Sequence, residues 1–169
     1  VVQGELSLAQ ATQQAAQTTL TQSQGASQAA QTIRMAVHRS TAEEIERVTE
    51  LLQRTNQFNT TLERFSSTEI HDLVLAGSVW TLTVTDKFVN YGMVGVAVVE
   101  DTTIRIVALS CRVIGLRVGG PFVATVLRRA GVAGKQPRGS IVIGPRNEPA
   151  RTLYAEIGFV QHVSREGWY

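Results

Sequence analysis

The sequence has few of the residues that form disulfides or metal sites. Its 169 residues include one cysteine, Cys111, which excludes an internal disulfide and gives no metal-ligand spacing. No stretch approaches the roughly 18 consecutive apolar residues that a membrane-spanning helix needs, and no basic segment followed by an apolar run opens the sequence. We therefore expect a cytoplasmic protein that binds neither membrane nor metal, in which Cys111 serves either packing or thiol chemistry.

Aromatic residues are also scarce, at 6% of the sequence, and they are not interleaved with the basic residues. A nucleic-acid partner is therefore not expected. The net charge of +2 hides an imbalance, because residues 1–100 hold six Lys and Arg against ten Asp and Glu, whereas residues 101–169 hold ten against four. The basic C-terminal part is typical of either a solvated surface or a face for an acidic or phosphate-bearing partner.

Residues 1–32 differ in kind from the rest of the sequence. They are dominated by Gln, Ala, Thr and Ser, contain no aromatic residue and have Glu5 as their only charge. Such a composition cannot build a core, so we interpret this stretch as a linker or as the end of an upstream domain. Residues 33–169 have the apolar content of one folded domain.

The first half of that domain predicts a strand, two helices and three strands. Two pairs, Thr41 with Glu44 and Ser66 with Glu69, have the spacing of capping boxes that open helices. Gly77 is expected to end the second helix in a left-handed cap. The strands are expected at residues 33–38, 79–85, 93–99 and 104–109, and the last three form an antiparallel meander.

The second half predicts helices alternating with strands. Pro121 is expected at the first helical position of one helix, and Asn147 as the N-cap of another, with strands at residues 140–144 and 159–165. The full order is β-α-α-β-β-β-α-β-α-β. This order indicates an α/β (α+β) domain.

Two segments carry candidate chemistry. In residues 110–120 a strand leads through a glycine-bearing loop to a helix, whose free N–H groups can cradle a phosphate. Residues 147–159 have the pattern Asn-x-x-Ala-x-x-Leu-Tyr-x-x-x-Gly-Phe.

Both motifs and the order of elements resemble the GNAT superfamily of acyltransferases. The resemblance implies a mixed, mostly antiparallel sheet with helices on both faces. It further implies a splayed parallel strand pair that grips the pantetheine arm of coenzyme A or of a carrier protein. It also implies that the loop binds pyrophosphate through Arg112, Gly115, Arg117, Gly119 and Gly120, although Arg117 stands where the family has glycine or alanine. Asn147 would bind the pantetheine arm, and Tyr154 would protonate the departing thiolate, as a phenol with a pKa near 10 can.

A narrower resemblance comes from the strings Thr-Asn-Gln-Phe-Asn at residues 55–59 and Ser-Cys-Arg-Val-Ile-Gly at residues 110–115. They are similar to the C-terminal half of FkbH-like proteins of polyketide biosynthesis, which load glyceryl on the phosphopantetheine of an acyl carrier protein. The resemblance implies a carrier-protein partner and a haloacid-dehalogenase-like phosphatase domain in the same or another chain. The sequence contains no Asp-x-Asp nucleophile motif, so we expect acyl transfer without dephosphorylation.

Other residues complete the predicted site. A neighbouring arginine and a helix N-terminus favour a thiolate at Cys111, which we expect to hold the acyl group as a thioester, although burial as a small hydrophobe competes with that role. His71 is the preferred candidate base, with a surface histidine as the alternative. Asn56, Gln57 and Asn59 are expected to bind a hydroxylated acyl group or pantetheine amides, or else to bond their own loop.

Two other functions fit the sequence. One is an amine N-acetyltransferase that uses acetyl-CoA, against which Arg117 in the loop argues. The other is a non-catalytic module that docks a carrier protein or a phosphatase domain.

Overall fold

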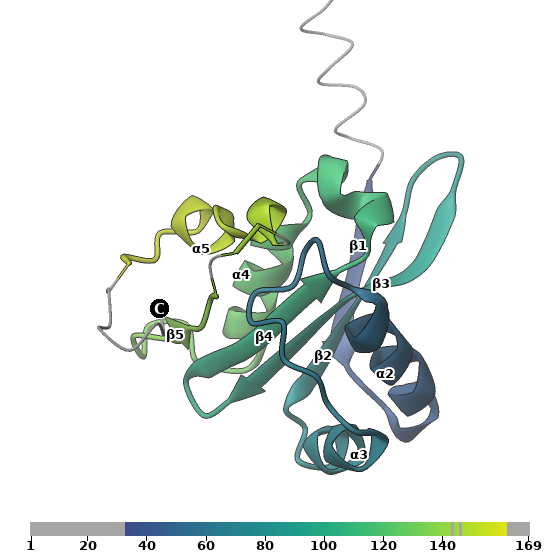
Figure 1. The fold of residues 1–169 in the computed structure, drawn as a ribbon, viewed down its shortest axis with the longest axis horizontal. Coiled ribbons are helices and arrows are strands. Elements are labelled where there is room, and N and C mark those ends of the chain that lie inside the picture. The colour runs from purple at the N-terminus through teal and green to yellow at the C-terminus, as the bar shows by residue number, and fades with distance from the viewer. Residues whose placement is uncertain (1–32, 143, 146, 162–169) are drawn as a thin grey trace, which may run out of the picture. The chain divides into compact units, whose positions relative to one another are not determined.

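The computed structural model describes residues 33–142, 144–145 and 147–161. The stretch predicted as a linker, residues 1–32, lies outside them. No helix of the described part is long and apolar enough to cross a membrane. The strands are β1 (Arg34–Arg39), β2 (Val79–Thr85), β3 (Asn90–Glu100), β4 (Thr103–Leu109) and β5 (Arg138–Gly139); the helices are α2 (Ile45–Arg54), α3 (Ser67–Leu75), α4 (Gly119–Arg129) and α5 (Leu153–Glu156) (Figure 1).

One five-stranded sheet in the order β1-β2-β3-β4-β5 organises these elements. β2 pairs with β3 and β3 with β4 in antiparallel register, so the predicted meander is confirmed. β4 and β5 are parallel and pair only at Thr103 with Arg138 and Ile104 with Gly139. The mixed sheet with a short parallel pair confirms the predicted fold class.

Helices α2 and α3 cover one face of the sheet. Val48, Leu52 and Ile70 are at most 1% exposed and pack with side chains of the same face of β3 and β4, such as Val96 and Ile106. Side chains alternate between the faces along a strand. Leu109, one residue beyond Ala108 of this cluster, therefore points to the opposite face, where α4 lies (Figure 1).

The helix boundaries follow the capping residues. Ser66 Oγ accepts a hydrogen bond from the backbone of Glu69, whose carboxylate accepts one from the Ser66 backbone, so this capping box is confirmed. At Thr41, Glu44 completes a box that opens a 3₁₀ turn, Ala42–Glu44, before α2 begins. Gly77 has φ of 71°, the left-handed conformation predicted.

Most of the described residues, from Met35 to Thr85 and from Asn90 onward, form one compact unit. The short turn Asp86–Val89, which connects β2 to β3 along the chain, is grouped outside this unit. The Asp86 carboxylate accepts hydrogen bonds from the backbone N–H groups of Phe88 and Val89, each at 2.7 Å. An aspartate bonded to the backbone two and three residues on is a turn former.

The structure differs from the prediction mainly at the start of one helix and at two strands. Helix α4 begins at Gly119, two residues before Pro121. Residues 140–142 and 144 form no strand, because another segment of the chain occupies the edge of β4 that they would need. The described residues of the predicted last strand, 159–161, are also not in a strand, and the rest of that prediction lies outside the described residues.

Candidate active site

The strands β4 and β5 part after their two paired positions, and the gap between them is filled by residues 58–60, here called the insert segment. The last bond between β4 and the β5 side runs from Ser140 N to Ile104 O, at 3.2 Å. Beyond it, the N–H of Leu109 donates to Phe58 O at 2.9 Å, and the N–H of Thr60 donates to Val107 O at 3.0 Å. The insert segment therefore continues the sheet at the place where β5 leaves it.

The far side of the insert segment is also hydrogen-bonded. The N–H of Val142 donates to Thr60 O at 2.7 Å. Within the segment, Asn59 is fully buried and opposes Ala108 of β4 in an antiparallel bridge. The splayed parallel pair predicted for this fold is thus present, and the chain itself lies in its opening.

Asn147 holds the insert segment from the side of α5. Its side chain is 0% exposed, and Nδ2 donates to Asn59 O at 3.1 Å, to Thr60 O at 3.4 Å and also to Val142 O. Its Oδ1 accepts from the N–H of Gly144 at 3.1 Å. Asn147 occupies the N-cap position of the 3₁₀ turn Glu148–Ala150, as predicted, but its side chain makes no capping bond there. Its amide is used to join three backbone segments instead.

Asn59, predicted to bind substrate, bonds its own loop. Its Nδ2 donates to Thr55 O at 3.3 Å, and its Oδ1 accepts from Leu62 N at 2.8 Å and from Thr61 N at 3.3 Å. These bonds stabilise a sharp turn in which Leu62 has φ of 57°. An asparagine that satisfies nearby backbone groups in this way positions the loop rather than a ligand.

Tyr154 projects from α5 into the same region. Its ring packs on Gly139 so closely that a Cβ at that glycine would lie 2.6 Å from Cε1 and Cζ of the ring. Phe159, which follows Gly158 at φ of 89°, packs against Tyr154 with the two ring centroids 5.3 Å apart and the rings tilted by 39°. Burial raises the pKa of the phenol far above its usual value, and the neighbouring Thr60 side chain lowers it in part. The buried hydroxyl has no hydrogen bond of good geometry.

The N-terminus of α4 is covered by side chains. Gly119 and Gly120, predicted to approach a pyrophosphate, are both buried. A Cβ at Gly119 would lie 3.3 Å from Cζ of Phe58 and 3.0 Å from Cδ1 of Leu153, and one at Gly120 would lie 3.1 Å from Cγ2 of Ile157. Apolar atoms therefore occupy the space directly against the two glycines.

The loop before α4 is a 3₁₀ helix, Cys111–Leu116, that ends at Arg117 in the left-handed conformation, with φ of 53°. Gly115 is exposed and has open space where a Cβ would be. Arg112 is also exposed, and its Nε donates to Ser110 Oγ at 3.4 Å. Arg117, which stands where the resemblance of the sequence implies glycine or alanine, therefore makes the backbone bend before α4.

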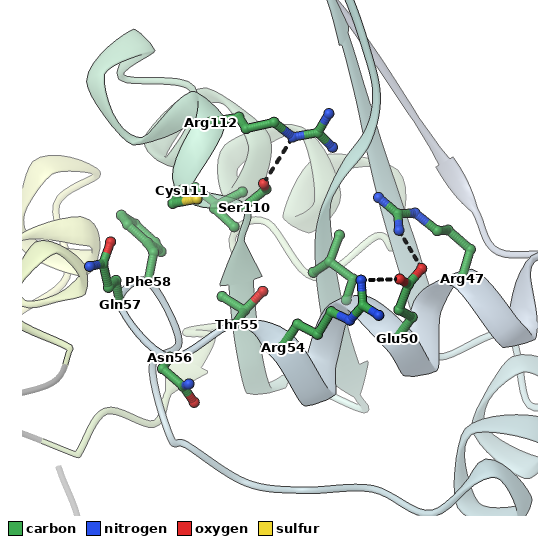
Figure 2. A pocket seen from close by; sticks show the side chains of 12 residues that line it. Arg47, Glu50, Arg54, Thr55, Asn56, Gln57, Phe58, Ser110, Cys111 and Arg112 are labelled. Atoms are coloured by element: carbon green, nitrogen blue, oxygen red, sulfur yellow. Dashed lines mark hydrogen bonds and ion pairs between the residues drawn. The ribbon is translucent and has the colours of Figure 1, made fainter.

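A hollow of about 540 Å³ lies between the end of α2, the residues that follow it and the end of β4. This volume is within the range of about 300–1,000 Å³ typical of small-molecule sites. Figure 2 shows Cys111 beside Phe58 and Gln57 at one end of the hollow, and the charged face of α2 at the other. The lining residues are Arg47, Glu50, Leu51, Arg54, Thr55, Asn56, Gln57, Phe58, Leu109, Ser110, Cys111 and Arg112.

The hollow carries an excess of positive charge, because Arg47, Arg54 and Arg112 line it together with a single carboxylate, Glu50. The Glu50 carboxylate accepts a hydrogen bond from Arg47, and its Oε1 lies 2.6 Å from Nη1 of Arg54 (Figure 2). The hydrogen bond from Arg47 holds the pKa of Glu50 below its usual value. Arg112 is the lining cation that no carboxylate of the hollow pairs.

The structure brings together some of the predicted site residues and separates others. Cys111 is exposed and lines the hollow with Gln57 and Asn56, although the Asn56 amide oxygen accepts a hydrogen bond from Arg64. His71 lies on α3, exposed and 3.5 Å from Asp72, and does not line the hollow. Tyr154, Asn147 and Asn59 form a second, buried group around the insert segment.

The sequence interpretation missed the arginines of α2. Arg47, Glu50 and Arg54 recur at intervals of three and four, so they share one helical face. That spacing was the available signal, but it is also typical of an ordinary solvated face. Thr60 was missed as well; its Oγ1 accepts a hydrogen bond from Val107 N at 2.9 Å.

Coenzyme A, which this fold implies, does not fit the gap between β4 and β5 as the structure has it. The insert segment occupies the edge of β4, and apolar side chains cover Gly119 and Gly120. The accessible space lies instead in the hollow beside Cys111.

The comparisons with known proteins bear on the fold. No protein-family profile and no curated protein matches the sequence. Among solved structures, an acetyltransferase of the GNAT family from Listeria monocytogenes has a TM-score of 0.54 at 13% identity, covering 80% of this chain and 91% of its own. A Mycobacterium tuberculosis protein in complex with CoA has a TM-score of 0.53 at 14% identity, over 78% of this chain and 77% of its own.

A third structure is a spermidine N-acetyltransferase from Vibrio cholerae, with a TM-score of 0.50 at 13% identity, covering 76% of this chain and 81% of its own. The likenesses extend over more than three quarters of the chain. This chain therefore has the GNAT fold.

Proposed function

We propose that this chain is an acyltransferase that receives an acyl group on the Cys111 thiol and passes it to the phosphopantetheine thiol of an acyl carrier protein. The observation that carries the proposal is the exposed Cys111 at one end of a cationic, amide-lined hollow. Cys111 is the one thiol of the sequence. A thiol has the highest intrinsic nucleophilicity among the side chains that line this hollow.

The two proposed steps exchange one acyl bond for another. In the first, the Cys111 sulfur attacks the acyl carbonyl carbon, the bond to the donor's leaving group breaks, and the thiol proton passes to solvent. In the second step, the carrier sulfur attacks the acyl carbon of the thioester, and the bond from that carbon to the Cys111 sulfur breaks. The carrier thiol loses one proton and the Cys111 thiolate takes up one, so the step balances. The side-chain amide of Gln57, which lines the hollow, would donate to the acyl group and orient it.

We further propose glyceryl as the acyl group, in agreement with the resemblance to FkbH-like proteins. The hydroxyl groups of glyceryl suit the amides of Asn56 and Gln57, which line the hollow. A haloacid-dehalogenase-like phosphatase domain, in this chain or another, would make the acyl group available. The excess positive charge of the hollow would then attract the phosphates of the carrier arm and of the donor.

Intact-mass spectrometry tests the proposal. The chain is incubated with 1,3-bisphosphoglycerate, a phosphatase-type partner and a phosphopantetheinylated carrier protein. We expect a mass gain equal to glyceryl on the chain and then on the carrier. Cys111→Ala should abolish the adduct on the chain, whereas Ser110→Ala, which removes the neighbouring hydroxyl from the same hollow, should retain it. Persistence of the chain's adduct in Cys111→Ala would exclude the thioester role.

The second candidate function is an N-acetyltransferase that uses acetyl-CoA. It is favoured by the spermidine N-acetyltransferase among the structures of this fold. Calorimetry with acetyl-CoA, set against the phosphopantetheinylated carrier protein, separates the two, because only the N-acetyltransferase requires tight binding of free acetyl-CoA. A non-catalytic docking module would bind the carrier and leave acyl transfer unchanged when Cys111 and Tyr154 are both replaced.

A further inference from the structure

We infer that the insert segment is a built-in substitute for the pantetheine arm, so that this chain does not admit free coenzyme A between β4 and β5. The inference concerns the gap between the strands and is independent of whether Cys111 is acylated. It is carried by the hydrogen bonds, the burial and the side-chain packing of the segment.

At the parted end, the insert segment takes up both backbone groups of Val107 and the N–H of Leu109 on the edge of β4. An extended chain that bears amides binds a strand edge through unpaired N–H and C=O groups. Both backbone groups of Val107 are bonded to Thr60. The Val107 N–H donates to Thr60 Oγ1 at 2.9 Å, and the Val107 C=O accepts from the Thr60 N–H at 3.0 Å. The N–H of Leu109 is used by Phe58 O.

The opposite side of the gap is closed in the same way. The Thr60 carbonyl accepts from the N–H of Val142 at 2.7 Å and lies 3.4 Å from Asn147 Nδ2. Asn147 also bonds the Asn59 carbonyl at 3.1 Å. The segment is therefore bonded on both sides, as an interior strand is, and no edge is left on which an arm could be added.

Side chains fill the remaining volume. The Tyr154 ring lies against Gly139 of β5, and the Phe58 ring lies against Gly119 at the start of α4. Asn59, Thr60 and Asn147 are each 0% exposed. Where the strands part, buried side chains therefore surround the insert segment, and both backbone groups of Val107 and the N–H of Leu109 are hydrogen-bonded to it.

Displacement of the segment would be costly. An entering arm would have to break the bonds of Phe58 and Thr60 to β4 and that of Val142 to Thr60, and its few amide groups could replace only part of them. The Asn147 amide would also lose two of its acceptors, and a buried donor without an acceptor is unfavourable. Binding of coenzyme A therefore has to overcome the hydrogen bonds that hold the insert segment on both sides.

Backbone amide hydrogen exchange, measured by NMR with and without coenzyme A, tests the inference. The Thr60 and Val142 amides should exchange slowly, and coenzyme A should leave their rates unchanged at concentrations that saturate an acetyl-CoA-dependent enzyme of the same fold. Faster exchange of both amides together with saturable coenzyme A binding would overturn the inference. The two tests can fail separately. If coenzyme A binds and both amides exchange faster, an acyl adduct on Cys111 would still support the proposed function. If both amides stay protected and no adduct forms on Cys111, only the proposed function is rejected.

A variant tests what holds the segment in place. Asn147→Asp keeps the oxygen that accepts from Gly144 and loses the donor that binds Asn59 and Thr60. We expect at least fivefold faster exchange of the Thr60, Leu109 and Val142 amides. The Ile70 amide, which donates to Ser66 O in α3, is the internal control for an intact fold. Unchanged rates at the three amides would contradict the inference; if the variant does not fold, the measurement with coenzyme A decides alone.

Discussion

The two sides of β4 are stabilised by different physical means. On the face under α2 and α3, apolar side chains such as Ile106 and Ile70 are fully buried and make contacts without preferred direction. At its parted edge, the polar side chains of Asn59, Thr60 and Asn147 are equally buried, but each is held by hydrogen bonds of fixed geometry.

The difference indicates that the two regions contribute different things. Apolar burial contributes most of the stability and tolerates changes of shape. A satisfied polar network contributes less net free energy, but it selects one arrangement, because every alternative leaves a buried donor or acceptor unpaired. The apolar face therefore holds the domain together, and the polar edge fixes where residues 58–60 lie.

The largest effect is expected on the apolar face. Ile106→Ala removes a fully buried side chain between β4 and α2, and we expect a loss of about 4 kcal/mol in the free energy of unfolding. Urea denaturation followed by circular dichroism measures it. Leu75→Ala, at a position of α3 that is 69% exposed, is the control and should change stability little. A loss below about 1 kcal/mol in Ile106→Ala would contradict the comparison.

A smaller effect is expected where the tyrosine closes the gap. Gly139→Ala places a Cβ about 2.6 Å from the Tyr154 ring, so that the ring has to move, and we expect a loss of about 2 kcal/mol. Thermal denaturation is a sufficient readout. Gly115→Ala, which meets nothing within 4 Å, is the matched control. Equal stability of the two variants would show that the ring does not pack as described.

The smallest effect at neutral pH is expected from Tyr154→Phe, because the hydroxyl that it removes has no well-formed hydrogen bond. We expect a change within about 0.5 kcal/mol. Burial raises the folded-state pKa of this phenol, so the native protein keeps the proton while the unfolded chain loses it above about pH 10. The wild type should therefore lose up to about 1.4 kcal/mol for each pH unit above that value relative to Tyr154→Phe. If the free energies of unfolding of the wild type and of Tyr154→Phe change equally with pH above pH 10, the hydroxyl is not buried as described.

The sequence was sufficient for the features that depend on local chemistry. Val79–Thr85 coincides with its predicted strand, the Ser66 capping box opens α3, and Gly77 ends it. Each of these depends on periodicity or on hydrogen bonds within a few residues. The order of elements through α4 and the antiparallel pairing of β2, β3 and β4 follow from the same local patterns.

The features at the parted strands depend on contacts distant in the sequence. Residues 140–144 have the composition of a strand, but the edge of β4 that would pair with them is occupied by Thr60, about 80 positions earlier in the chain. Asn147 has the position of an N-cap, yet its amide reaches Asn59 across 88 residues. No local pattern reports such competition for one strand edge, so the sequence alone could not predict it.

The single thiol of the chain is also convenient for measurement. Because Cys111 is exposed at one end of the hollow and no other cysteine competes with it, a maleimide fluorophore would label the molecule at one defined position. Its emission would report on the arrival of a carrier arm in the hollow in real time, without any substitution elsewhere in the protein.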